Sequence, residues 1–180
     1  MYCLFLADGF EEVEALTPLD YLRRAKVDVR TVGVTAKEIR GAHDIIVRAD
    51  ISISDLTVDD SIEGVILPGG MPGVKNLDQS EKLKEIIRFC DERSALVAAI
   101  CAAPSILGRM GLLEGKQAVC YPGFEDQLMG AVVKEDKVVT DKNYITSRGA
   151  GCANEFSFAL IEYLKDRETA ESIASSVIYR

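Results

Sequence analysis

The sequence predicts an α/β fold built on a mostly parallel central sheet, with helices on both faces. Short apolar runs rich in Val, Ile and Leu alternate with segments of helical periodicity, which is the signature of β-α-β units. Each apolar run leads into turn residues or a polar periodic segment. The chain has 180 residues, of which 48% are hydrophobic, and this length is enough to bury one core. We therefore expect a single domain over residues 1–180.

The predicted core strands share a continuous apolar character, which is typical of parallel strands that are buried on both faces. They cover residues 1–7, 28–34, 64–67 and 95–100. Helical patterns lie between them at about 13–26 and 79–92. Pro18 falls inside the first helical pattern, where it removes a backbone donor. We expect it to kink that helix rather than to break it.

The remaining elements are predicted from alternation and turn residues. Residues 45–53 alternate around Ala-Asp and predict a small β-ribbon inserted between the second and third core strands. Residues 131–147 contain three short strand patterns separated by polar turns. Two helices, at about 152–164 and 167–178, complete the predicted fold.

Charge and hydropathy exclude several classes of function. The net charge of -8 and the absence of a Lys/Arg cluster disfavour binding to nucleic acid or to anionic lipid. No apolar run reaches 18 residues, and the segment MYCLFLADGFEE has no basic region before it turns acidic. We therefore expect a cytoplasmic protein without a signal peptide or membrane span, whose partner is a small molecule or another protein.

The five cysteines form an odd set without a C-x-x-C pair. This pattern favours free thiols in a reducing compartment over a disulfide framework, a thioredoxin-like motif or a zinc site.

Ligands of parallel α/β sheets bind beyond the carboxyl ends of the strands, so the loops at that edge are where a site is expected. Three of these loops have unusual composition. They are DGFEEVE at 8–14, PGGMPG at 68–73 and CAAP at 101–104.

Cys101 is the predicted nucleophile because it lies between a buried strand and a helix-compatible run. A helix N-terminus at this position favours the thiolate and lowers the thiol pKa. The alternative is a small buried apolar residue. A fall in pKa from about 8.5 to about 5.5 raises the thiolate fraction about thirtyfold at pH 7, but each thiolate becomes roughly 15- to 30-fold less nucleophilic. Catalysis therefore requires a proton partner and donors aimed at the developing negative charge.

Gly70 and Ala102 are the predicted donors, since their backbone N–H groups can form an oxyanion hole. The alternative for the glycine loop is an ordinary tight turn. Among the carboxylates of the first loop and helix, Glu14 lies deepest in the helix and is the predicted proton partner of Cys101, with its pKa raised by burial. The other carboxylates complement the helix dipole, and a Mg²⁺ site of the receiver-domain kind is the rival use of this cluster.

His43 is the only histidine in the chain and lies upstream of Cys101. A cysteine hydrolase of the Cys-His type would have to bring His43 across the fold. We therefore interpret His43 as an exposed polar residue or an interface contact.

Four segments in this order make the chain resemble a known family along nearly its whole length. They are ADGFEEVEA at 7–15, ILPGG at 66–70, AAICAAP at 98–104 and TSRGAG at 146–151. The chain resembles the ThiJ/PfpI superfamily, in the branch of the parkinsonism-associated deglycase (DJ-one).

The resemblance implies a flavodoxin-like three-layer sandwich and, usually, a homodimer. It places the reactive cysteine on Cys101, its protonated glutamate partner on Glu14, and the anion donors on Gly70 and Ala102. It brings Arg148 and Gly149 near the pocket or the dimer contact, and no cofactor or metal is expected.

Two positions depart from relatives. Deglycase relatives have a histidine where this chain has Tyr121, and a phenol is a poor base at pH 7, although it can donate a hydrogen bond. The protease branch has a histidine where this chain has Ala102, which disfavours protease activity.

Two functions of different classes remain open. In the first, the protein is a cofactor-free glyoxalase or deglycase that converts methylglyoxal-type α-oxoaldehydes, or their adducts, into 2-hydroxy acids such as lactate. In the second, it is an oxidative-stress sensor or protective chaperone in which Glu14 stabilises an oxidised Cys101 without turnover. Both hypotheses use the same two residues.

Overall fold

The central sheet of the computed structural model, which describes residues 1–179, has seven strands in the order β10-β11-β7-β6-β1-β2-β5. Only β10 runs antiparallel to its neighbour. The strands are β1 (Tyr2–Leu6), β2 (Val29–Gly33), β5 (Ile51–Ser52), β6 (Gly64–Leu67), β7 (Leu96–Ile100), β10 (Val138–Asp141) and β11 (Tyr144–Ser147). The four predicted core strands are thereby confirmed as β1, β2, β6 and β7.

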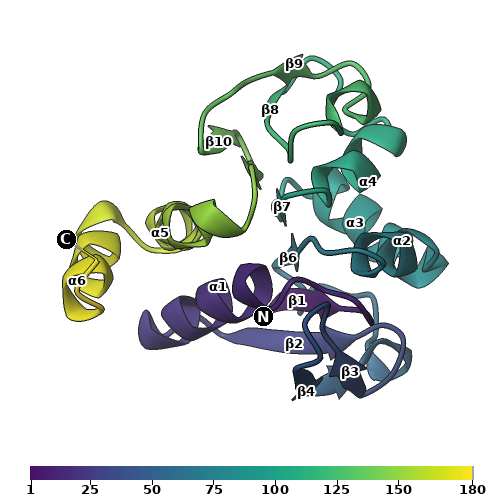
Figure 1. The fold of residues 1–180 in the computed structure, drawn as a ribbon, viewed down its shortest axis with the longest axis horizontal. Helices are drawn as coiled ribbons and strands as arrows, with labels where there is room; N and C mark the ends of the chain where they lie inside the picture. The colour runs from purple at the N-terminus through teal and green to yellow at the C-terminus, as the bar shows by residue number, and fades with distance from the viewer. Residues whose placement is uncertain (180) are drawn as a thin grey trace.

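Helices cover both faces of this sheet (Figure 1). One face carries α1 (Glu12–Arg24), α5 (Ala153–Leu164) and α6 (Arg167–Ser176); the other carries α2 (Gly73–Asp78), α3 (Glu81–Glu92) and α4 (Pro104–Arg109). Two apolar clusters fill the two interfaces, one around Phe5 and Leu67, the other around Leu4 and Phe156. The predicted three-layer α/β sandwich is therefore confirmed.

Helix α1 runs without interruption from Glu12 to Arg24 although it contains Pro18. The predicted absence of a break is confirmed. Proline lacks a backbone N–H, which destabilises the helix interior. Pro18 is buried, so burial of its ring offsets part of this loss.

The predicted ribbon at 45–53 needs correction. The antiparallel pair consists of β3 (Glu38–Arg40) and β4 (Ile46–Arg48), and residues 51–52 form β5, which extends the main sheet next to β2. The alternation in 45–53 indicated an extended backbone but did not identify the strand that pairs with it. Ala49 and Asp50 separate β4 from β5. A second small pair, β8 (Gln117–Ala118) with β9 (Val132–Val133), was not predicted as a pair. Short 3-10 turns lie at Ile53–Asp55, Glu125–Gln127 and Ala150–Cys152.

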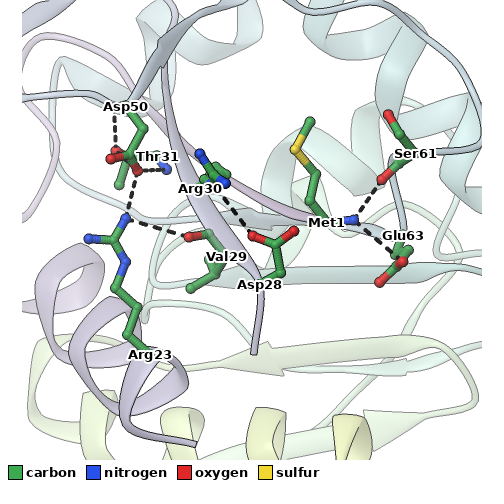
Figure 2. A network of polar contacts seen from close by, with 9 residues as sticks. All are labelled: Met1, Arg23, Asp28, Val29, Arg30, Thr31, Asp50, Ser61 and Glu63. Atoms are coloured by element: carbon green, nitrogen blue, oxygen red, sulfur yellow. Dashed lines mark hydrogen bonds and ion pairs between the residues drawn. The ribbon is translucent and has the colours of Figure 1, made fainter. Parts of the chain in front are cut away.

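Asp50 ties the segment after the ribbon to β2 and α1 (Figure 2). Its Oδ2 accepts hydrogen bonds from the backbone N–H and hydroxyl of Thr31 at 2.8 and 2.9 Å and from Nη2 of Arg23 at 2.6 Å. The Asp50 N–H donates back to the Thr31 hydroxyl at 2.9 Å. Four hydrogen bonds thus fix the point where the chain enters β5.

We expect Asp50→Ala to lower the free energy of unfolding by about 1–3 kcal/mol, because Thr31 and Arg23 lose their shared acceptor. Urea denaturation measures this change. Asp28→Ala is the matched control, since the Asp28 side chain forms an exposed ion pair with Arg30, and the effect of this substitution should stay within about 0.5 kcal/mol. Equal losses in the two variants would contradict the role given to Asp50.

Among residues 1–179, no helix combines the length and apolar character needed to cross a membrane.

The strands of the central sheet bring the loops that follow them to one edge. Because β1, β6, β7 and β11 are parallel neighbours, the loops after their carboxyl ends converge, and strand β1 has its sequence neighbour β2 on one side and β6 on the other. This is the switch point at which ligands bind in open α/β sheets.

Candidate active site

Cys101 occupies a tight elbow directly after β7. Its φ angle is +65°, a conformation that costs a non-glycine residue about 1–2 kcal/mol. Two hydrogen bonds hold the elbow: the Cys101 N–H donates to the Ser147 carbonyl at 2.9 Å, and the Cys101 carbonyl accepts from the Tyr121 N–H at 2.7 Å. Strained backbone that its neighbours hold in place is characteristic of functional sites.

The thiol of Cys101 lies against the carboxyl group of Glu14 and forms a hydrogen bond with it. Glu14 comes from the first turn of α1 and is only 1% exposed. Its Oε2 also accepts a hydrogen bond from the Gly69 N–H at 2.8 Å. The structure therefore brings together the two residues for which the sequence predicts a shared role.

The backbone N–H groups of Gly70 and Ala102 form hydrogen bonds with the Cys101 sulfur. Both predicted donors therefore lie beside the sulfur that would act as the nucleophile. Gly70 has a φ of +91°, and a Cβ there would lie 2.3 Å from the backbone nitrogen of Glu11. This position consequently requires glycine.

Gly69 is a site residue that the sequence analysis did not single out. A Cβ at this position would lie 2.5 Å from Glu14 Oε2 and 2.9 Å from the Cys101 sulfur. Only glycine lets the loop pass this close while its N–H orients the carboxyl group. The repeated glycine in PGG was the available signal, because two successive glycines after a buried strand indicate a close approach of backbone to another group.

Burial raises the pKa of the Glu14 carboxyl to about 7, partly offset by hydrogen bonds from Cys101 and Gly69. The predicted direction is confirmed. Burial likewise raises the pKa of the Cys101 thiol, and the Glu14 charge raises it further, to about 12. The expected lowering of the Cys101 pKa is wrong for a physical reason: α4 begins only at Pro104, so the thiol gains little from the helix dipole and is partly buried beside an acid.

These two pKa values belong to a coupled pair. Because the Glu14 charge raises the pKa of the Cys101 thiol, the pair loses its second proton less readily than its first. The thiol holds this proton while Glu14 is ionised and in contact with it. Such an arrangement suits a reaction in which the carboxylate takes the thiol proton as the sulfur attacks.

Tyr121 lies beside the elbow but is half exposed. Its ring faces Gly149, where a Cβ would lie 3.2 Å from Tyr121 Cδ2 and 3.8 Å from Glu14 Oε1. Within residues 1–179 no hydrogen bond joins the Tyr121 hydroxyl to Cys101 or Glu14. Gly149 therefore borders the pair, whereas Arg148 points elsewhere and donates to the Glu135 carbonyl at 3.1 Å.

His43 lies apart from the thiol, as the sequence led us to expect. Its Nδ1 contacts Glu12 Oε2 at 2.9 Å, and the side chain is 68% exposed. Glu12 also accepts a hydrogen bond from the His43 N–H at 2.8 Å. This contact raises the pKa of His43 and fastens the ribbon to α1.

The acidic residues of the first loop are divided among different partners. Asp8 accepts from the Arg40 N–H at 2.9 Å. Glu11, Glu12 and His43 each place one possible metal ligand within 4.8 Å of the others, but Glu12 already accepts hydrogen bonds from the ribbon backbone. Glu14 faces Cys101 instead, so the four carboxylates do not form one metal-binding cluster.

Comparison with known proteins supports a single family. Residues 2–163 match the DJ-1/PfpI family. The Parkinson disease protein 7 homolog of Danio rerio is 34% identical over 181 aligned positions, which cover 98% of this chain and 96% of that protein. A Pyrococcus abyssi protein named as a deglycase is 30% identical over 161 positions, covering 88% of this chain and 96% of its own. The solved structure of oxidized Toxoplasma gondii DJ-1 superimposes with a TM-score of 0.94 at 34% identity, covering 98% of this chain and 97% of that one.

Proposed function

The chain belongs to the DJ-1/PfpI family, and from this premise we propose that it is a cofactor-free, cysteine-dependent glyoxalase or deglycase acting on methylglyoxal-type α-oxoaldehydes or their adducts. The observation that carries the proposal is the contact of the Cys101 thiol with the buried Glu14 carboxyl and with two backbone donors. The similar Pyrococcus abyssi protein is named as a deglycase, which supports the same chemistry.

The first step forms a bond between the Cys101 sulfur and the aldehyde carbon. The thiol proton passes to Glu14, and the carbonyl oxygen becomes an alkoxide next to the N–H groups of Gly70 and Ala102. Protonation of this oxygen gives a hemithioacetal. Since Glu14 is half ionised near its pKa of about 7, it can both accept and return a proton at neutral pH.

The second step is an internal redox exchange. A base removes the proton from the former aldehyde carbon, and a proton returns to the neighbouring carbon, so that the aldehyde is oxidised to a thioester while the ketone is reduced to an alcohol. Water then cleaves the thioester to lactate and free Cys101. Methylglyoxal and one water give one lactic acid, and no external oxidant or reductant is needed. For an adduct, the bound amine or thiol leaves as well.

Formation of lactate from methylglyoxal in the absence of glutathione tests this proposal. Wild-type protein is expected to form lactate with repeated turnover, and an enzymatic lactate assay measures it. Protein that consumes methylglyoxal only in proportion to its own lysines and arginines would contradict the proposal. This outcome is recognised by intact mass, because the adducts stay on the protein.

The second candidate function is an oxidative-stress sensor or protective chaperone that works through Cys101 oxidation without turnover. The hydrogen bond between Glu14 and Cys101 favours it, because a protonated Glu14 can donate to a cysteine sulfinate, and the similar Toxoplasma gondii structure is described as oxidized. Mild peroxide is expected to add two oxygens to Cys101, seen by peptide mass spectrometry, and Glu14→Leu should alter the extent. Equal oxidation of the five cysteines would exclude this function.

We also propose a homodimer formed through α1 and the ribbon. Val13, Ile45 and Ile46 are 48%, 51% and 55% exposed, and the Glu12–His43 contact places their two elements side by side. A twofold interface would bury these side chains. Light scattering should give twice the chain mass, and Ile46→Asp should shift it toward the monomer, whereas a monomeric wild type would refute the proposal.

A further inference from the structure

The turn of the ribbon, between β3 and β4, rests on one buried carboxylate. Glu12 lies in the first turn of α1, and its side chain is only 5% exposed. Its Oε1 accepts hydrogen bonds from the N–H groups of His43 and Ile45 at 2.8 and 3.4 Å. A Cβ at Gly41 would collide with the same oxygen, so the turn closes directly over the carboxylate. The ribbon is therefore attached to α1 through a buried negative charge.

His43 is the cation that faces this charge. Its Nδ1 lies 2.9 Å from Glu12 Oε2 and 3.6 Å from Glu11 Oε1. In the described part of the chain, no other side-chain cation pairs with either glutamate. The other charged side chains next to the turn bond to one another and are Asp8, Arg40 and Asp44. The two glutamates thus depend on the only histidine of the chain, the side chain whose charge changes near neutral pH.

The loop between β1 and α1 connects this contact to the active site. On one side, the Gly9 N–H donates to the Arg40 carbonyl of the ribbon at 2.7 Å. On the other side, the Glu11 N–H donates to the Gly69 carbonyl at 2.9 Å. The Gly69 N–H in turn orients the carboxyl group of Glu14. One short segment is therefore bonded both to the ribbon and to the glycine loop.

Protonation of His43 should favour the docked ribbon. The hydrogen bond with Glu12 and the charge of Glu11 raise the pKa of His43 above its usual 6.5, so the docked ribbon binds this proton more tightly than an undocked one. The stabilisation is full below about pH 6.5 and is lost as pH rises through the raised pKa. Burial would raise the pKa of Glu12, but hydrogen bonds from His43 and Ile45 outweigh it and lower this pKa. Glu12 therefore stays charged while His43 titrates.

We propose that His43 and Glu12 form a pH-sensitive contact: protonated His43 holds the ribbon on α1, and loss of its proton loosens both the ribbon and the glycine loop beside Cys101. Both are positioning residues, since neither touches the sulfur. The effect is graded, because a neutral imidazole can still donate its Nδ1–H to Glu12. This inference goes beyond the proposed function, because it concerns the local stability of the site and applies to either candidate activity.

Amide hydrogen exchange followed by NMR between pH 6 and pH 8.5, with EDTA present to remove metal ions, tests the proposal. The chain has one histidine, so a single imidazole signal gives the pKa of His43. After correction for intrinsic rates, exchange of the His43 and Glu11 N–H groups should become about two- to fivefold faster as His43 loses its proton. This is the size expected for an exposed charge contact. The midpoint of the change should equal the pKa of His43.

Two substitutions of the histidine separate charge from titration. His43→Lys keeps a positive charge across this pH range, so exchange should stay slow. His43→Gln carries no charge, so exchange should be fast at every pH. Asp44→Asn is the matched control, because it removes a charge from the same turn without a contact to Glu12, and Asn tolerates the φ of +65° at this position. The control should keep the change with pH.

Four results would overturn the inference. They are the absence of any change with pH, a midpoint that differs from the pKa of His43, a change confined to the His43 N–H, and a change that persists in both His43 variants. The last result would assign the change to Glu14, whose pKa is about 7. A failure of lactate formation counts only against the proposed function, because exchange is measured without substrate. The two hypotheses can therefore fail separately.

Discussion

Cys101→Ala should lower kcat/KM for lactate formation from methylglyoxal by at least about 10³-fold, to the level of the buffer. The reason is that the hemithioacetal, the thioester and the final hydrolysis all require the sulfur. The surrounding donors remain in the variant, but they have no covalent intermediate to stabilise.

The control for this variant is Cys90→Ala, which removes a buried thiol from α3 on a face of the sheet away from Glu14. It should retain activity, and circular dichroism should show that both variants are folded. Wild type and Cys101→Ala with equal activity would eliminate every mechanism that starts at this sulfur.

Glu14→Gln should lower kcat by about 10²- to 10⁴-fold, because an amide cannot accept the thiol proton. Gln retains an oxygen that can accept the Gly69 hydrogen bond, so the loop should stay in place. In wild type, activity should rise with pH through about 7, as the carboxylate form of Glu14 increases. The residual activity of the Glu14→Gln variant should not show this rise with pH.

The same substitution should change how stability depends on pH. Burial raises the pKa of Glu14 from 4.5 to about 7, so the folded protein binds this proton more tightly than the unfolded chain does. The stability linked to this proton is fully present below about pH 4.5 and is lost as pH rises through about 7. The loss amounts to about 3 kcal/mol, and the non-ionising Gln variant should not show it.

Urea denaturation of both proteins at pH 4.5 and pH 8 measures this difference. Relative to wild type, Glu14→Gln should gain about 3 kcal/mol between the two pH values. Glu85→Gln, on the exposed side of α3, should leave the curve parallel to wild type. A Glu14→Gln curve parallel to wild type would contradict the buried, proton-binding role of Glu14.

Much of the fold could be predicted because the central strands carry a strong local signal. β1, β6 and β7 are buried on both faces, so their sequences are continuous apolar runs. The ribbon was misplaced because alternation indicates an extended backbone but does not identify its partner. Glu38–Arg40, which pairs with Ile46–Arg48, has no apolar alternation that would have shown it to be a strand.

The approximate position of the site was also predictable, since a parallel sheet gathers the loops that follow its strands. The choice of Glu14 over its acidic neighbours had a weaker basis. Glu12 is buried as well, but it accepts hydrogen bonds from the ribbon. No local sequence pattern shows which of the two carboxylates faces the ribbon and which faces Cys101. Gly69 was missed because its role depends on a carboxyl group 55 residues earlier in the chain.

The sequence alone determined the alternation of strands and helices, the elbow at Cys101 and the glycine loop that faces it, because these follow from local apolar patterns and backbone restrictions. Only the tertiary structure decided the protonation of the Cys101–Glu14 pair. The pKa of a thiol depends on its burial and on the charges packed around it, and both arise from segments that are distant in sequence. For this reason the expectation that a helix N-terminus lowers the pKa of Cys101 was wrong. The expected contact between Cys101 and Glu14 is present in the structure.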